Sequence, residues 1–292
     1  MTGRVCIFGE VLFDHFPDGR RVLGGAPFNV AWHLQAFGEE PLLVSRIGDD
    51  AEGASVRAAM QAWCMDSSGL QVDANLPTGR VQVHISDGEP SYEIVHPAAW
   101  DAIGTPAGVP AMSLLYHGSL ALRDEASRSG WRSLRDSRPH LVFVDVNLRP
   151  PWWRREQVLR DITGAHWIKL NRDELDRLAP GDASVRTRAE ALLRGLGLQG
   201  LLLTDGARGA SLLTLTGDYL ETRPPCGIVV ADTVGAGDAL AAVMLLGLAR
   251  GWPLEVSLER AQRFASATVG QHGATVQDPD FYAPFVTQWT VA

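Results

Sequence analysis

The sequence predicts an α/β fold built around a mostly parallel sheet. Short apolar runs bounded by Gly, Asp, Asn or Pro alternate with segments of helical length, which is the pattern of strands and helices that follow one another. The runs are continuously apolar, so we expect strands that are buried on both faces. A chain of 292 residues, 46% of them hydrophobic, is long enough to bury a large core. We expect a single domain over residues 1–292.

The elements expected from this alternation fall into two sets. The strands are Val5–Phe8, Leu42–Ile47, Leu114–His117, Leu141–Val144, Trp167–Leu170 and Leu201–Thr204. The helices are Pro27–Phe37, Ala51–Cys64, Glu125–Asp136, Glu174–Leu178, Val185–Leu196, Gly235–Arg250 and Leu254–Val269. The helix at 235–250 is small and apolar all round, which predicts that it is buried.

Two stretches interrupt the alternation and predict a small second sheet. Residues 81–86 and 92–95 alternate apolar and polar side chains around Asp87-Gly88-Glu89-Pro90, as in a hairpin with one exposed face. Val11–Leu23 is a second hairpin with Pro17-Asp18-Gly19 at its tip. Hairpins of this kind either cover a site at the carboxyl ends of the strands or form a decorative edge sheet. The pattern leaves both alternatives open.

Charge and composition exclude several classes of function. The net charge is −8 without basic runs, which argues against a nucleic-acid-binding protein. We find no signal peptide and no apolar segment that spans a membrane, and therefore expect a cytoplasmic protein. The three cysteines are widely spaced, so they are expected to be reduced thiols. Lys169 is the only lysine among 26 basic residues, and no Gly-Lys-Ser/Thr phosphate loop exists.

The run Asp232-Thr-Val-Gly-Ala-Gly-Asp238 predicts an anion site that uses no lysine. A turn at Gly235-Ala236-Gly237 directs backbone N–H groups to one point, and the following helix adds the positive end of its dipole. Asp238 in the first helical turn lies within reach of a hydroxyl that must lose its proton. Taken alone, the run is better explained by a tight turn and a helix start than by a ligand site.

A second run, from Leu23 to Gly38, places paired glycines before a helix. Gly24 and Gly25 permit a close approach of backbone to ligand, and the amide of Asn29 can bind hydroxyls. Asp14 can accept hydrogen bonds from two sugar hydroxyls. A helix start, a buried amide and a turn aspartate explain the same residues without a ligand.

Together these runs resemble the two signatures of the ribokinase-like (PfkB) family of carbohydrate kinases. The first matches Gly24–Gly38 and continues through Ser45–Gly53, and the second matches Asp232–Leu240, about 200 residues later. Asn171-Arg-Asp-Glu174 matches the Asn-x-x-Glu element of the family, and Thr204–Gly209 matches its glycine-rich nucleotide turn. The resemblance covers essentially the whole chain and implies a three-layer αβα fold with a small β lid at about 11–23 and 76–98.

The resemblance also implies a role for each matching residue in an ATP-dependent sugar kinase. Asp238 would be the base, and the N–H groups of Gly235, Ala236 and Gly237 would form the anion hole. The remaining roles divide by ligand. The sugar would be bound by Asp14, Gly24, Gly25, Asn29 and Arg149. The nucleotide would be bound by Lys169, Asn171, Glu174, Thr204, Gly206 and Gly209.

Metal ions and a second subunit complete these expectations. Asn171 and Glu174 would organise Mg²⁺ largely through water. Asp232, with carbonyls around residues 268–273, would bind a monovalent cation such as K⁺. The lid could pair with that of a second copy in a homodimer. Lys169 precedes Asn171 by two residues, which places it at the mouth of the expected nucleotide site.

The identity of the sugar is less sharply indicated. Asp145-Val-Asn-Leu-Arg-Pro-Pro-Trp152 resembles a stretch shared by fructokinases and 2-keto-3-deoxygluconate kinases, and Arg149 could bind a carboxylate, a hydroxyl or only a structural partner. The opening Gly9–Asp14 and the run Pro77–Val81 look more like bacterial fructokinases. We therefore expect fructose, with a keto-acid or another small sugar or nucleoside as the alternative.

Two rival classes of function remain: a non-catalytic sugar or nucleotide sensor, and a Rossmann dehydrogenase. The intact Asp238 argues against the first, and the lack of a GxGxxG unit argues against the second.

Overall fold

The large sheet of the protein has the predicted parallel core. The computed structural model describes residues 3–86, 89–106, 108 and 111–290, and within them the strand order of this sheet is β13-β12-β11-β10-β9-β8-β1-β4-β5. The six expected strands are β1 (Arg4–Phe8), β4 (Leu42–Gly48), β8 (Met112–Gly118), β9 (Leu141–Asp145), β10 (Trp167–Asn171) and β11 (Gly200–Thr204). All of them pair in parallel, so their carboxyl ends lie along the same edge.

Three strands were not expected. β5 (Leu70–Asp73) extends the parallel sheet beside β4, while β12 (Ala210–Thr214) and β13 (Tyr219–Thr222) add an antiparallel end beside β11. Neither end changes the core of the sheet, in which β1, β8, β9 and β10 are consecutive neighbours.

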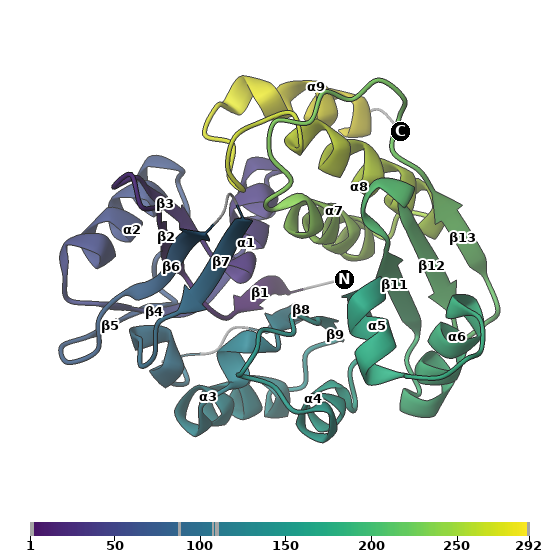
Figure 1. The fold of residues 1–292 in the computed structure, drawn as a ribbon, viewed down its shortest axis with the longest axis horizontal. Helices are drawn as coiled ribbons and strands as arrows, with labels where there is room; N and C mark the ends of the chain where they lie inside the picture. Colours follow the sequence, from purple (N-terminus) through teal and green to yellow (C-terminus); the bar gives the residue numbers. More distant parts are fainter. Residues whose placement is uncertain (1–2, 87–88, 107, 109–110, 291–292) are drawn as a thin grey trace.

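Helices cover both faces of the sheet and make three layers. In Figure 1, α7 and α8 lie above the sheet and α3 and α4 lie below it. The first face is covered by α1 (Ala26–Ala36), α2 (Ala51–Ala62), α7 (Ala236–Arg250), α8 (Leu254–Thr268) and α9 (Pro279–Thr290). The second face is covered by α3 (Glu125–Asp136), α4 (Arg155–Ile162), α5 (Arg172–Leu178) and α6 (Val185–Leu196). The expected three-layer α/β fold is confirmed, although α4 and α9 were not predicted.

Side-chain alternation along the strands separates the two faces of the core. Ile7, Tyr116 and Phe143 pack with the α7 layer, whereas their neighbours Phe8 and Val144 pack on the opposite face. Helix α7 is small and apolar, and its residues from Ala239 to Gly247 are buried, as expected. The amino end of α7 therefore rests against the sheet with little room between them.

The two predicted hairpins form one small sheet. β2 (Leu12–His15) pairs with β3 (Arg21–Gly24), β6 (Gly79–Ser86) pairs with β7 (Glu89–Ile94), and a parallel contact between β2 and β6 joins them in the order β3-β2-β6-β7. Figure 1 shows these four strands on the left side of the molecule, near α1. At the expected turn of the second hairpin, Asp87 and Gly88 lie outside the described residues. Among the described helices, none has the length and apolar character required to cross a membrane.

Candidate active site

The amino end of α7 combines a glycine turn with a carboxylate. Gly235 precedes the helix with φ of +80°, and a Cβ atom there would lie 2.5 Å from the Cβ of Ala274, so both backbone conformation and space require glycine. The first N–H groups of a helix have no acceptor within it. The groups at Gly235, Ala236 and Gly237 are therefore suited to an anion, and Asp238 follows in the first turn.

A hydrogen bond joins the two signature segments across 209 residues of chain. Asn29 Nδ2, on α1, donates to Asp238 Oδ2 at 2.8 Å. A Cβ atom on Gly24 would lie 3.7 Å from Asn29 Oδ1 and 3.9 Å from Asp14 Oδ2. Asp14, Gly24, Asn29 and Asp238 thus surround one small region at the carboxyl edge of the sheet, and Gly25 adjoins it as the residue before α1.

The two carboxylates of this region have raised pKa values. Burial raises the pKa of Asp238 to about 6, although Lys169 and the hydrogen bond from Asn29 act in the opposite direction. Burial likewise raises the pKa of Asp14 to about 6, opposed by the charge of His15. A carboxyl group with a pKa near 6 is largely ionised at neutral pH and accepts a proton more readily than an ordinary aspartate.

Lys169 lies beneath this region and is paired with a strand neighbour. Its Nζ donates to both oxygens of Asp145 at 2.8 Å, and Tyr116 donates its hydroxyl to Asp145 Oδ2 at 3.1 Å. A Cβ atom on Gly237 would lie 3.3 Å from Lys169 Nζ. The sequence placed Lys169 at the mouth of a nucleotide site, but the structure buries its ammonium group directly against the glycine turn. The only lysine of the sequence therefore lies beside the glycine turn, which the sequence analysis had interpreted as an anion site that uses no lysine.

Arg149 is a free cation beside the same carboxylates. Its side chain is exposed, and its charge lowers the pKa of both Asp238 and Glu10. Within the described part of the chain no ion-pair partner of Arg149 lies within 4.0 Å. It lines a cavity of about 380 Å³ together with Asn147 and Trp152. Arg149 is therefore available to an oxygen of a bound molecule.

Asn171 and Glu174 form a capping box at the start of α5. Asn171 Oδ1 accepts from the N–H of Glu174 at 2.9 Å, and Glu174 Oε2 accepts from the N–H of Asn171 at 2.8 Å. Glu174 Oε1 also accepts from the N–H of Leu148 at 3.1 Å. These bonds engage each of the three oxygens once and fix the two side chains. Each oxygen can still accept a second bond, so the expected contact with Mg²⁺ through water fits this arrangement.

The other expected nucleotide and cation residues lie on loops near the same edge. Thr204 ends β11, and Gly206 faces open space, with no atom within 4 Å of the position of a Cβ atom. Gly209 instead lies against the carbonyl of Thr222, at 2.0 Å from the position of a Cβ atom, which is a packing requirement. Asp232 accepts from the N–H groups of Val234 and Gly273, so its oxygens join the two loops that were expected to bind K⁺.

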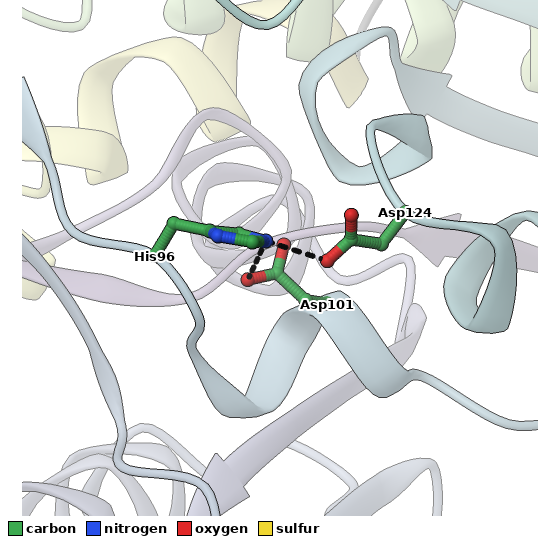
Figure 2. Close-up of side chains that lie close together, drawn as sticks. All are labelled: His96, Asp101 and Asp124. Carbon is green, nitrogen blue, oxygen red and sulfur yellow. Dashed lines mark hydrogen bonds and ion pairs between the residues drawn. The ribbon is translucent and has the colours of Figure 1, made fainter.

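A cluster of charged and aromatic side chains lies after β7 and β8. His96, Asp101 and Asp124 bring possible ligand atoms within 4.8 Å of one another, and His96 Nε2 lies 2.8 Å from Asp124 (Figure 2). Asp101, however, is bound by Nε and Nη2 of Arg123 at 2.6 and 2.7 Å. Because this carboxylate already has a cation, the cluster is better suited to fixing Arg123 than to binding a metal ion.

Sequence reasoning missed three residues of this region. Asp145 was noted only as part of a motif, Tyr116 was not considered, and Glu10 was noted only as part of an opening motif. Asp145 and Lys169 are partners in the register between β9 and β10. Polar residues at the carboxyl ends of apolar strands could have identified these residues, because the carboxyl ends of parallel strands lie along one edge of the sheet. The order of the strands, which the sequence does not contain, was needed to pair them.

The fold and the site together define a class of chemistry. A glycine turn at a helix start binds a phosphoryl group, a neighbouring carboxylate accepts a proton, and adjacent amide and carboxylate groups bind hydroxyls. This arrangement is suited to phosphoryl transfer onto an alcohol, which is catalysed mainly by positioning and electrostatic stabilisation.

Comparison with known proteins agrees with this class. The model of the family described as "pfkB family carbohydrate kinase" matches residues 7–280. An aminoimidazole riboside kinase of Salmonella typhimurium is 32% identical over 265 residues, with 85% of this chain and 81% of the relative covered. A fructokinase of Klebsiella pneumoniae is 32% identical over 275 residues, with 85% of each chain covered.

A solved structure shows the same architecture along the whole chain. The aminoimidazole riboside kinase from Salmonella enterica, complexed with aminoimidazole riboside and an ATP analogue, has a TM-score of 0.82 and 29% identity. The match covers 97% of this chain and 99% of that one. The protein belongs to the pfkB family of carbohydrate kinases and is a sugar kinase, a phosphotransferase.

Proposed function

We propose that the protein transfers the γ-phosphoryl group of ATP to a terminal hydroxyl of a free sugar, with D-fructose as the acceptor. The observation that carries the proposal is the hydrogen bond from Asn29 to Asp238 at 2.8 Å. It supports the proposal because it joins Asn29, an expected sugar-binding residue, to Asp238, the expected base beside the glycine turn. Similarity to the Klebsiella pneumoniae fructokinase and the opening Gly9–Asp14 support fructose.

In the proposed reaction each group has a stated task. Asp14, Gly24, Gly25 and Asn29 hold the sugar so that one hydroxyl faces Asp238. Asp238 accepts the hydroxyl proton while the oxygen bonds to the γ-phosphorus and the bond from phosphorus to the ADP oxygen breaks. The N–H groups of Gly235, Ala236 and Gly237 stabilise the charge that develops on the phosphoryl oxygens. Thr204, Gly206 and Gly209 border the proposed nucleotide cleft.

Ions and the small sheet have supporting tasks in the proposal. Mg²⁺ accompanies the phosphates of ATP and neutralises part of their charge, while Asn171 and Glu174 contact it only through water. Asp232 contributes to a K⁺ site beside the anion hole. The sheet β3-β2-β6-β7 acts as a lid that excludes water from the transfer. Its edge strands β3 and β7 are the surfaces on which a second copy would pair.

A second acceptor is favoured by a specific observation. The aminoimidazole riboside kinase is as similar to this chain as the fructokinase, at 32% identity. The free cation at Arg149 keeps 2-keto-3-deoxygluconate as a third candidate, because a guanidinium group binds carboxylates well. The three acceptors differ in charge and size but share a terminal hydroxyl.

A coupled assay of ADP release tests the proposal directly. We expect the highest kcat/KM with D-fructose among D-fructose, aminoimidazole riboside, 2-keto-3-deoxygluconate, ribose and adenosine. Faster turnover of any other acceptor would reassign the substrate.

In the same assay Asp238→Asn is expected to lose about three orders of magnitude or more in kcat while ATP still binds. Near-normal activity of this variant would remove Asp238 from the base role, and ATP binding without turnover of any sugar would support a sensor.

A further inference from the structure

The cavity beside Arg149 takes no part in the proposed reaction. It has a volume of about 380 Å³ and lies between the loops that follow β8 and β9, with parts of α3 and α4 completing its wall. None of the described residues that line it belongs to the acceptor region, which is formed by Asp14, Gly24, Asn29 and Asp238. Figure 1 shows α3 and α4 on the opposite side of the sheet from α7. The cavity is therefore a separate space, and Arg149 is the one expected sugar-binding residue on its described wall.

The wall of this cavity carries an excess of positive charge. Its described charged residues are five arginines and two aspartates, whereas the whole chain has a net charge of −8. The arginines are Arg123, Arg128, Arg149, Arg154 and Arg160, and the aspartates are Asp124 and Asp161. Charges of one sign around a concave surface raise the local concentration of ligands of the opposite sign. The cavity is therefore suited to an anion.

Three of the five arginines have no carboxylate of their own. Arg123 and Arg128 each bind an aspartate at 2.6 Å. Arg149, Arg154 and Arg160 are exposed, and among the described residues no carboxylate oxygen lies within 4.0 Å of their guanidinium nitrogens. A guanidinium group binds phosphate and carboxylate groups through two parallel hydrogen bonds. These three side chains are free to do so with a bound molecule.

The amino end of α4 adds to the positive potential. The residue before the helix is Arg154, and its side chain forms no capping hydrogen bond. The amino end of a helix favours an anion and disfavours a cation. Glu156 is the acidic residue of the first turn, but it does not line the cavity. An anion between Arg154 and Arg160 would therefore relieve an unfavourable arrangement of charge.

The size of the cavity and the rest of its wall indicate an organic molecule. Pockets for small organic ligands have volumes of about 300–1,000 Å³, whereas a water molecule takes about 30 Å³. One inorganic ion would fill only a small part of this space. Trp152, Trp153 and Val158 provide apolar surface in the same wall. Aromatic and aliphatic side chains of this kind pack against a carbon skeleton.

We propose that this cavity binds a small organic molecule with two or more phosphate or carboxylate groups, at a site distinct from those of the acceptor and the nucleotide. Arg149, Arg154 and Arg160 bind its anionic groups, and Trp152 and Trp153 contact its carbon skeleton. The site takes up no group from ATP. It is therefore independent of which sugar the protein phosphorylates.

Calorimetric titration with three anions tests the proposal. Inorganic phosphate, succinate and 3-phosphoglycerate are titrated into the protein, with glycerol as the uncharged counterpart of the last. The glycine turn of α7 is also expected to bind an anion, so a saturating ATP analogue that cannot be hydrolysed and the best acceptor are present throughout. We expect one molecule of 3-phosphoglycerate or succinate per chain to bind at least about tenfold more tightly than inorganic phosphate. The stronger of the two identifies whether phosphate or carboxylate groups are preferred.

The double variant Arg154→Gln/Arg160→Gln locates the site. Neither residue has a task in the proposed reaction, so turnover without added anion should stay within about twofold of the wild type. The dissociation constant of the bound anion should rise about tenfold or more, because two charge-assisted contacts are lost. The matched control is Arg194→Gln/Arg263→Gln, which removes the same charge from exposed positions on α6 and α8 outside the cavity. Arg160 and Arg263 each donate to a glutamine, at 2.7 and 2.8 Å, so the pairs are comparable, and the control should bind the anion within about twofold of the wild type.

Four outcomes would overturn the proposal. Binding of none of the three anions would show that the cavity is not an anion site, and equal affinity in the wild type and the double variant would place the anion elsewhere. Equal affinity for glycerol and 3-phosphoglycerate would show that charge is not recognised. Inorganic phosphate that binds as tightly as the organic anions would indicate an adventitious ion only. Thermal unfolding verifies that both variants are folded, with Arg154→Gln alone replacing a double variant that is not. Calorimetry needs no turnover, so the failure of fructose as the acceptor leaves this test intact.

Discussion

Lys169 lies where the electrostatics of a helix would not by themselves favour a cation. The amino end of a helix is positive, yet the ammonium group of Lys169 is buried against Gly237 at the start of α7. Burial alone would lower the pKa of Lys169, but the carboxylates of Asp145, Asp238 and Glu174 raise it above its usual value. Two sources of positive potential thus converge on the glycine turn. Such convergence is useful when an anionic group occupies that turn during phosphoryl transfer.

We predict that neutralising the ion pair of Lys169 and Asp145 changes the pH profile of catalysis. Because Lys169 lowers the pKa of Asp238 and Asp145 raises it less strongly, the double variant Lys169→Met/Asp145→Asn should have a base with a higher pKa. In the proposed reaction the rate depends on ionised Asp238, so kcat/KM of the wild type should rise with pH through about 6. In the variant this rise should move to higher pH, and the plateau rate should fall about 100-fold. Steady-state kinetics over a pH series measures both.

The double variant is chosen because it leaves no buried charge unpaired. Removing both members of a buried ion pair is often tolerated, whereas removing one is strongly destabilising. The buried pair of Arg128 and Asp161, at 2.6 Å between α3 and α4, provides a matched control. Arg128→Met/Asp161→Asn should leave the pH profile where it is. A Lys169/Asp145 variant with the profile and plateau of the wild type would show that the pair is only structural.

The structure brings together residues that the two signatures name. Asp14, Gly24, Asn29 and Asp238 meet in one region, as the signatures led us to expect, while their roles stay predictions. The partners Asp145 and Tyr116 depend on which strands are neighbours. The hydrogen bonds run from Tyr116 on β8 to Asp145 on β9, and from Lys169 on β10 to Asp145. No local sequence pattern reveals this order of the strands.

At the scale of elements, the predicted strands were those with continuous apolar runs. The missed elements have physical reasons. β12 is as long as β11, but Ser211 and Thr214 interrupt its apolar run, and β13 has only four residues, two of them Glu221 and Thr222. Helix α9 contains Pro284, which normally argues against a helix interior. Helix α4 is mostly polar, with only Val158, Asp161 and Ile162 buried.

The capping box of α5 is the element for which the structure supplies a clear energetic prediction. Glu174 is buried and accepts backbone N–H groups of Asn171 and Leu148, so it fixes the start of α5 and the chain leaving β9. Glu174→Ala leaves these donors without their partner and should lower the free energy of unfolding by about 2–3 kcal/mol. Urea unfolding of the variant measures this change.

A neighbouring carboxylate serves as the control for this element. Asp173 lies in the same first turn of α5 but is exposed, so Asp173→Asn should change the free energy of unfolding by about 0.5 kcal/mol or less. Equal losses in the two variants would mean that charge at the helix start, rather than the capping box, stabilises α5. The Mg²⁺ dependence of the rate, measured on the same proteins, tests the proposed contact through water separately.

At the scale of the whole molecule, the small sheet is attached to the large domain through one buried carboxylate of α2. Glu52 lies 2.7 Å from His15 on β2, 2.8 Å from Arg80 on β6 and 3.6 Å from Arg21 on β3. It therefore contacts three of the four strands of the proposed lid. Asp50, just before α2, adds bonds to the N–H and hydroxyl of Thr78, at the entry to β6.

These contacts fix the small sheet, and with it Asp14 on β2, relative to α2 and the large sheet. Asp14 belongs to the proposed acceptor region. If the small sheet acts as a lid, weakening its attachment should allow water to reach the phosphoryl group. Glu52→Gln removes the charge that His15, Arg80 and Arg21 share, while it keeps the shape of the side chain. We expect the KM for the sugar to rise about tenfold, because the position of Asp14 is less well defined, and ATP hydrolysis without sugar to increase relative to sugar phosphorylation.

Measuring ADP release with and without the sugar decides this prediction. Glu93 on β7 provides the control, because it is exposed and contacts only His84 at 3.2 Å among its ion-pair partners in the described residues. Glu93→Gln should leave both rates within about twofold, since exposed ion pairs contribute little. A Glu52→Gln variant with unchanged KM and unchanged hydrolysis would show that the small sheet is a rigid edge of the domain. A rise in both quantities would identify α2 as the support that holds the lid over the acceptor.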